Sequence, residues 1–205
     1  MAVTSYSTLL QAVLDAANNV EVEQAIPTFI GLAEARFNRE LRTYQMIERS
    51  DATTSDEYVS LPADFLETYS LRQPGTTNLQ ALKYVGPEEA KKLQAENQTG
   101  DVRWFTIAAA SYQLIPAPTS SVDLELLYYQ KVPALNGSNT TNWLIDLSPD
   151  AYLFTTLAEA ADYLDDKRFD RWEARAASAI AAVQLAGRSA LRQGVRLTST
   201  PRPFN

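Results

Sequence analysis

Residues 149–193 contain two consecutive stretches in which apolar residues recur at helical spacing, and these stretches constrain the fold of this chain more than any other feature. Ser148 followed by Pro149 and Asp150 is a typical helix start, so we expect a helix from there to about residue 165. A second, longer helix should run over residues 167–193, and the two aromatic residues near its start should anchor it to the core. Its predicted apolar positions are Phe169, Trp172, Ala176, Ala179, Ile180, Val183 and Leu191.

The N-terminal region shows the same helical period. A first helix is predicted to end at Asn18 and Asn19, since apolar residues recur at helical intervals at Tyr6, Leu9, Leu10, Val13 and Leu14. A second helix should open near Glu23, with Pro27 in its first turn, and reach about Ile47. We expect it to have an apolar side, with Ile26, Ile30, Ala33, Phe37, Leu41 and Tyr44, and a polar side, with Glu34, Arg36, Arg39, Glu40 and Arg42.

The period changes to two in the middle of the chain, where residues 56–132 favour strands. The alternation is clearest over residues 122–132, and it should place Tyr128 and Tyr129 on opposite faces of a sheet. One short helix, over residues 87–98, interrupts the strands, because Gly86 and Pro87 start it and acidic residues occupy its first turn. The predicted strands lie at 57–61, 68–72, 79–85, 104–108, 112–116 and 122–132.

These patterns predict an α+β fold, mainly an α-helical bundle of about four long helices, with an inserted antiparallel β-sheet region. The expected organisation is a helical bundle core from residues 1–50 and 148–193, a β insertion with one short helix at 51–135, a polar loop at 136–147, and an extended C-terminal arm at 194–205.

The composition argues against several classes of function. The chain has no histidine and no cysteine, so it lacks the usual general base near neutral pH and the thiolate ligands and nucleophiles. Its formal net charge of −7 disfavours a general nucleic-acid binder, because phosphate neutralisation needs a basic surface. The N-terminus lacks the basic start of a signal peptide, and no apolar run approaches about 20 residues. We therefore expect no cofactor, no signal peptide and no membrane partner.

Two groups of carboxylates are candidates for chemistry. Glu159, Asp162, Asp166 and Asp170 recur at helical spacing and could offer oxygen ligands to magnesium or calcium. Because Lys167, Arg168 and Arg171 lie beside them, we expect ion pairs and no metal site. Asp64 and Glu67 are the nearest approach to a hydrolase pair, but Asp64 follows Pro62 and is more typical of a turn. We predict no catalytic residues.

The tail at residues 194–205 lacks a helical pattern, and together with the end of the helix before it forms a cationic C-terminal end. It contains no acidic residue after Glu173, and it ends with a proline-flanked aromatic residue, Phe204. One interpretation is a frayed terminus. The other is an arm that becomes ordered on a partner, with arginines for carboxylates and the aromatic ring as an apolar anchor. Its cationic residues are Arg188, Arg192, Arg196 and Arg202.

The order of several phrases along nearly the whole chain resembles the adaptor (connector, head-completion) proteins of tailed bacteriophages. The phrases are AEARFNRELR (33–42), LPADFLE (61–67), ALKYVGPEEAKKL (81–93), WFTIAAASYQLIPAPTSSVDLELLYYQKVPAL (104–135) and TNWLIDLSPDAYLFTTLAEAADYLDDKRFDRWE (141–173). They are structural phrases and not catalytic signatures, so their order and spacing carry the resemblance. The poorest match is the extreme C-terminus.

The resemblance implies a homo-oligomeric ring of about twelve copies at the neck of the virion, made in the host bacterial cytoplasm. Such a ring joins the portal protein to a tail or nozzle protein, and genomic DNA passes through it only as transiting cargo. It further implies that the C-terminal arm reaches the portal, which makes the predicted portal interface Arg188, Arg192, Arg196, Arg202 and Phe204. The alternatives are a tail-completion or stopper protein one layer further down, and a carboxylate-dependent cell-wall hydrolase.

Overall fold

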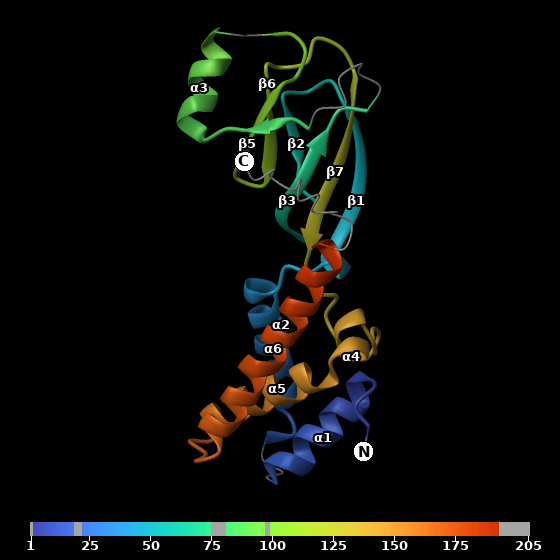
Figure 1. Ribbon diagram of the computed structural model, residues 1–205, viewed down its shortest axis with the longest axis vertical. Coiled ribbons are helices and arrows are strands. Elements are labelled where there is room, and N and C mark those ends of the chain that lie inside the picture. The colour runs from blue at the N-terminus through green and yellow to red at the C-terminus, as the bar shows by residue number, and fades with distance from the viewer. Residues whose placement is uncertain (1, 19–21, 75–80, 97–98, 193–205) are drawn as a thin grey trace, which may run out of the picture. The chain divides into compact units, whose positions relative to one another are not determined.

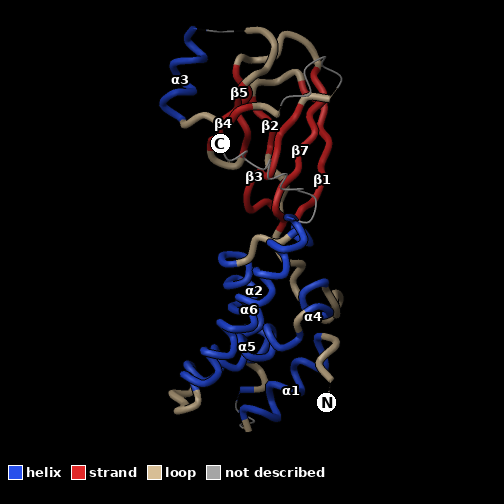
Figure 2. Tube along the Cα trace, in the orientation of Figure 1, coloured by secondary structure: helices blue, strands red, loops and turns tan. Residues whose placement is uncertain are grey.

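A computed structural model describes residues 2–18, 22–74, 81–96 and 99–192 (Figure 1). The chain divides into two compact units: a helical unit, Met1–Gln45 with Val132–Asn205, and a β unit, Met46–Lys131. Among the described residues, the strands lie in the β unit, as does helix α3 (Figure 2).

The helices of the helical unit begin and end where local chemistry dictates. α1 (Tyr6–Ala17) opens with a capping box between Ser5 and Thr8, and it ends at Asn18, which has a left-handed backbone with φ of 53°. α2 (Ile26–Glu40) has Pro27 in its first turn, as predicted. The remaining helices of this unit are α4 (Trp143–Leu147), α5 (Pro149–Tyr163) and α6 (Phe169–Arg192).

α5 is the central helix of this unit and packs against α1, α2, α4 and α6. α6 buries Ala176, Ala179, Ile180 and Val183, as the sequence predicts. Phe169 and Trp172 are only half-buried and Leu191 is exposed, so the expected aromatic anchoring of α6 in the core is wrong. Other large side chains at the centre of the unit are Leu9, Ile26, Ile30, Phe37, Leu144 and Tyr152.

The β unit consists of two sheets. One sheet has the order β1-β7-β3 and is antiparallel; its strands are β1 (Ile47–Thr54), β7 (Val122–Gln130) and β3 (Phe65–Arg72). The other has the order β2-β6-β5-β4, with strands β2 (Tyr58–Ser60), β6 (Ser111–Ile115), β5 (Trp104–Ala108) and β4 (Lys83–Tyr84). α3 (Pro87–Glu96) packs on β5 and β6. The inner faces of both sheets share a core that includes Leu71, Phe105, Tyr112, Leu114, Leu124, Leu126 and Tyr128.

The expected bundle of about four long helices with one inserted antiparallel sheet is wrong, although the chain is α+β overall. The described residues form six α-helices, of which α3 lies in the β unit and α4 has only 5 residues. They also form two sheets, and β4 pairs with β5 in parallel.

The second helix ends well before the predicted Ile47. Leu41 has an extended backbone at the C-terminus of α2, a 3₁₀ turn follows over Tyr44–Met46, and Ile47 begins β1. The polar sequence of β1 does not suggest a strand, but all 8 of its residues pair with β7. A full ladder of backbone hydrogen bonds therefore overrides the weak β-propensity of these residues.

Candidate functional site

A buried polar cluster in the helical unit holds the chain where it re-enters this unit. The Glu34 carboxylate, on α2, accepts hydrogen bonds from the Leu135 amide at 2.7 Å and the Tyr152 hydroxyl at 3.2 Å. Four residues along α2, the Asn38 side chain accepts a bond from the Val132 amide at 2.8 Å. Two acceptors one helical turn apart thus fix residues 132–135 along α2. The sequence places Glu34 on an exposed polar side, and this expectation is wrong, because its side chain is buried.

Asn142 completes this cluster. Its amide donates to the Tyr152 hydroxyl at 2.7 Å and to the Pro133 carbonyl at 2.6 Å, and its side-chain oxygen caps α4. Burial raises the pKa of Glu34 above its ordinary value, against the lowering effect of the bond from Leu135. These hydrogen bonds join side chains to backbone groups and to one another, so the cluster fixes residues 132–135 and the start of α4 in place.

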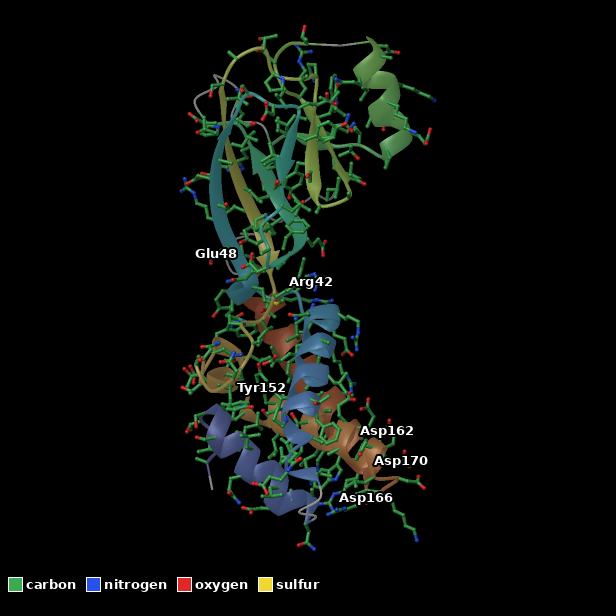
Figure 3. All side chains as sticks on the ribbon, turned by 180° about the vertical axis from the view of Figure 1, so that it is seen from behind. Arg42, Glu48, Tyr152, Asp162, Asp166 and Asp170 are labelled. Atoms are coloured by element: carbon green, nitrogen blue, oxygen red, sulfur yellow. The ribbon has the colours of Figure 1, made fainter. Side chains whose placement is uncertain are left out.

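The predicted carboxylate cluster lies near the connection between α5 and α6, where Figure 3 shows Asp162, Asp166 and Asp170. Asp166 pairs with Arg168 at 2.6 Å, and this bond lowers the pKa of the carboxyl. Arg168 also donates to the carbonyls of Ala16 and Ala17, so it caps the C-terminal end of α1. Within the described part of the chain, no three acidic side chains lie where they could together hold a metal ion.

Ion pairing and stacking hold α6 in the helical unit. Arg36 on α2 makes a bidentate pair with Glu173 on α6, with both N–O distances at 2.7 Å. This pair raises the pKa of Arg36 and lowers the pKa of Glu173. Beyond it, Trp172 stacks on Phe154 with ring centroids 5.9 Å apart, and the Arg175 guanidinium lies 5.1 Å from the Phe154 ring centroid.

The C-terminal half of α6 packs closely against the chain that follows α2. There Gln184 accepts a hydrogen bond from the Arg42 amide at 2.9 Å. Three residues later Gly187 is buried directly against Thr43, so a Cβ atom at Gly187 would lie 2.7 Å from Thr43 Cγ2. Glycine therefore fits this position without a shift of Thr43, and any larger residue would need one, because the two segments approach each other closely.

The predicted hydrolase pair does not form a catalytic arrangement. Asp64 accepts a hydrogen bond from the Tyr128 hydroxyl at 3.0 Å, and its backbone carbonyl accepts one from the Lys131 amide at 2.7 Å. Its carboxylate thus fixes the start of β3 to the end of β7. Tyr128 lies in the core and Tyr129 contacts Tyr69 on the other face, which confirms that the two rings point to opposite faces.

The β unit contains a groove of about 510 Å³, which we call the edge groove. Tyr69 and Tyr84 line it with 51% and 55% of their surface exposed. Sequence patterns do not indicate this groove, because residues from three separate segments form it. The full lining is Phe65, Leu66, Glu67, Thr68, Tyr69, Ser70, Leu71, Ala81, Leu82, Tyr84, Phe105 and Ile107.

The structure describes only part of the predicted portal interface. Arg188 lies exposed on α6, and Arg192 is the last residue of that helix. The other three residues, Arg196, Arg202 and Phe204, lie outside the described residues, so their position stays a prediction.

None of the helices in the described residues combines the length and the apolar character needed to span a membrane. In a comparison with protein families, the model of the SU10 adaptor protein family matches residues 4–199. This match confirms the resemblance to the adaptor proteins of tailed bacteriophages. No curated protein matches the chain.

Proposed function

Because the chain belongs to the SU10 adaptor protein family, which is a family of bacteriophage adaptor proteins, we propose that it forms the ring that joins the capsid of a tailed phage to its tail. The observation that carries this proposal is the extent of the match, residues 4–199, which includes both the helical unit and the β unit. A phage adaptor is a structural protein of the virion, and no site among the described residues argues for chemistry instead.

In the proposed assembly, about twelve copies form a closed ring beneath the portal protein, at the neck of the virion. A closed ring needs one surface of each copy to match a different surface of the next copy. The tail or nozzle protein binds the opposite side, and genomic DNA passes through the lumen. The net charge of −7 supports this role, because an acidic protein does not retain the phosphate backbone as DNA moves past it.

We assign portal attachment to the cationic end of the chain, with Arg188, Arg192, Arg196, Arg202 and Phe204. Arginine forms bidentate pairs with carboxylates on a partner surface. One exposed ion pair contributes only about 0–1 kcal/mol. Repetition of such pairs around a ring converts weak contacts into firm attachment, because each copy after the first binds at high effective concentration.

The experiment compares the full chain with a chain lacking residues 195–205, using isolated portal rings from the same phage. The deletion should leave the far-ultraviolet circular dichroism spectrum unchanged and should abolish co-sedimentation with the portal. Arg188→Glu should weaken attachment at least tenfold. Arg39→Glu, which changes an exposed arginine on α2, is the matched control and should have little effect.

Two results would contradict the proposal. If the shortened chain caps portals as well as the full chain, the docking surface lies outside the C-terminal arm. If the full chain binds isolated tail protein but not portal rings, the protein belongs one layer further down the assembly, as a tail-completion or stopper protein.

A further inference from the structure

The middle of α6 carries no charge on any side. Between Arg175 and Arg188 the chain reads AASAIAAVQLAG, which is more than three helical turns without an acidic or basic residue. One side of this stretch is buried in the helical unit and the other is exposed. A helix at a protein surface normally carries charged or polar residues on its outward side, so an uncharged outward side indicates a surface that another protein covers.

We call this exposed side of the helix the α6 face. Its members recur at helical intervals and are Ala174, Ala177, Ser178, Ala181, Ala182 and Leu185. Leu185 has 70% of its surface exposed. The small side chains allow a second helix to approach to about 8 Å between helix axes, and Leu185 gives that helix a large apolar side chain to cover.

A second uncharged surface lies on α2. Residues 24–35 contain a single charged residue, Glu34, and its side chain is buried. The exposed side of this stretch, which we call the α2 face, consists of Pro27, Thr28, Gly31, Leu32 and the half-buried Ala35. Leu32 has 47% of its surface exposed. The exposed ring of Tyr163 adjoins this face, because it lies 5.4 Å from the ring of Phe29, between centroids.

The two faces lie on opposite sides of the helical unit. In Figure 1 α6 lies in front of α2, and in Figure 3, which shows the unit from behind, α2 lies in front of α6. Both helices pack on α5, which covers their inner sides. A copy with two different faces on opposite sides can bind one neighbour with each face, which is the head-to-tail arrangement that a closed ring needs.

The exposed charges beside the two faces favour contact of one face with the other. Two arginines and one acid adjoin the start of the α6 face: Arg171, Arg175 and Asp170. Two acids and one arginine adjoin the α2 face: Glu23, Asp162 and Arg39. Aromatic rings hold the arginines of the α6 face in place, since the Arg171 guanidinium lies 5.3 Å from the Trp172 ring centroid. Opposite net charge on the two surfaces orients their association.

We infer that the α6 face of one copy packs on the α2 face of the next copy. This inference rests on the proposed ring, in which each copy supplies one face of each kind, so that head-to-tail contact uses every face once. Leu185 and Leu32 supply the apolar surface that is removed from water, and the small residues around them supply the close approach of the two helices.

Cross-linking of single-cysteine variants of the full chain tests this contact, since the natural chain has no cysteine. Ala181→Cys places a thiol on the α6 face, and Thr28→Cys places one on the α2 face. The two variants, mixed without portal and treated with a short bifunctional maleimide, should form a cross-linked heterodimer. Ser7→Cys, at an exposed serine of α1, is the matched control for Thr28→Cys and should give at least tenfold less product with Ala181→Cys.

Two further measurements separate this contact from other association. Each variant alone should give at least tenfold less homodimer than the mixture gives heterodimer, because each face binds the other face and not itself. Adding Leu185→Asp to the Ala181→Cys chain should lower the heterodimer yield at least tenfold, whereas Leu185→Met, which keeps an apolar side chain, should not. Because Leu185 is exposed, neither change disturbs the core of the helical unit.

Three outcomes would overturn the inference: no more heterodimer with Thr28→Cys than with Ser7→Cys, as much homodimer from Ala181→Cys alone as heterodimer from the mixture, or a heterodimer yield that Leu185→Asp leaves unchanged. Any of them would place the contacts between copies elsewhere and would leave the joining of capsid to tail standing. Because portal is absent from the mixture, a failure of portal attachment leaves this test unaffected.

Discussion

A single methyl group at Gly187 should test the close approach of α6 to Thr43. In an open helix, replacing glycine by alanine stabilises a protein by about 1 kcal/mol, because alanine has the better helix propensity. At Gly187 the new Cβ would lie 2.7 Å from Thr43 Cγ2, 2.8 Å from its Cβ and 3.2 Å from its Cα. The last of these atoms is backbone, so a rotation of the threonine side chain cannot relieve the whole conflict.

Overpacking of this kind costs typically about 1–3 kcal/mol, which equals or exceeds the propensity gain. Gly187→Ala should therefore lower the free energy of unfolding by about 0–2 kcal/mol. Gly31→Ala is the matched control, because Gly31 lies within α2 and a Cβ atom added there would have no other atom within 4 Å. It should instead stabilise the protein by about 0.5–1 kcal/mol.

Thermal unfolding followed by circular dichroism can resolve this difference, since 1 kcal/mol corresponds to about 2–4 °C in Tm for a chain of this size. Adding Thr43→Ser to Gly187→Ala removes the nearest methyl group and should recover part of the loss. If Gly187→Ala and Gly31→Ala raise Tm equally, α6 does not approach Thr43 as closely as described, and the reasoning fails.

Three further experiments test the helical unit. Burial raises the pKa of Glu34, so the stability that its protonated form contributes is present below about pH 4.5 and is lost as pH rises through the folded-state pKa. Glu34→Gln should therefore become more stable relative to the natural chain as pH increases from 4 to 7. A difference in free energy of unfolding in urea that stays constant with pH would contradict this. A double-mutant cycle on Arg36 and Glu173 should give a coupling free energy of about 1 kcal/mol, reduced by the partial exposure of the glutamate, and a zero coupling would contradict a stabilising role for this pair. Trp172→Ala should lower the free energy of unfolding by about 1–3 kcal/mol, which is less than for a fully buried tryptophan, because the Trp172 ring is half-buried against Phe154. Complete unfolding of this variant would instead indicate that the Trp172 ring lies in the core.

The parts of the fold that depend on local chemistry could be predicted from the sequence. α1 ends at Asn18 and α5 begins at Pro149, as expected, because caps and first-turn prolines act within a few residues. Even here the detail differs, since Ser148 donates to Asp150 and its side chain does not cap the helix. The polar loop expected at 136–147 likewise contains the short helix α4.

The parts that depend on distant partners could not be predicted. The strand β1 contains Ser50, Asp51 and Thr53, and only its pairing with β7, which comes much later in the chain, makes it a strand. The helical period does place Glu34 beside Ile26 and Ile30, but the groups that make burial of its carboxylate possible, the Leu135 amide and the Tyr152 hydroxyl, come much later in the chain. The edge groove joins residues 65–71 with residues 81–84 and 105–107, so it exists only in the folded β unit.

The proposed neck position is tested most directly by cryo-electron microscopy of the virion that contains this chain, with a focused reconstruction of the region below the portal. Our proposal predicts a closed ring of about twelve copies between portal and tail, into which the helical unit and the β unit can each be fitted, with the C-terminal end of each copy against the portal. A portal vertex in direct contact with the tail, or this chain located away from the neck, would contradict it.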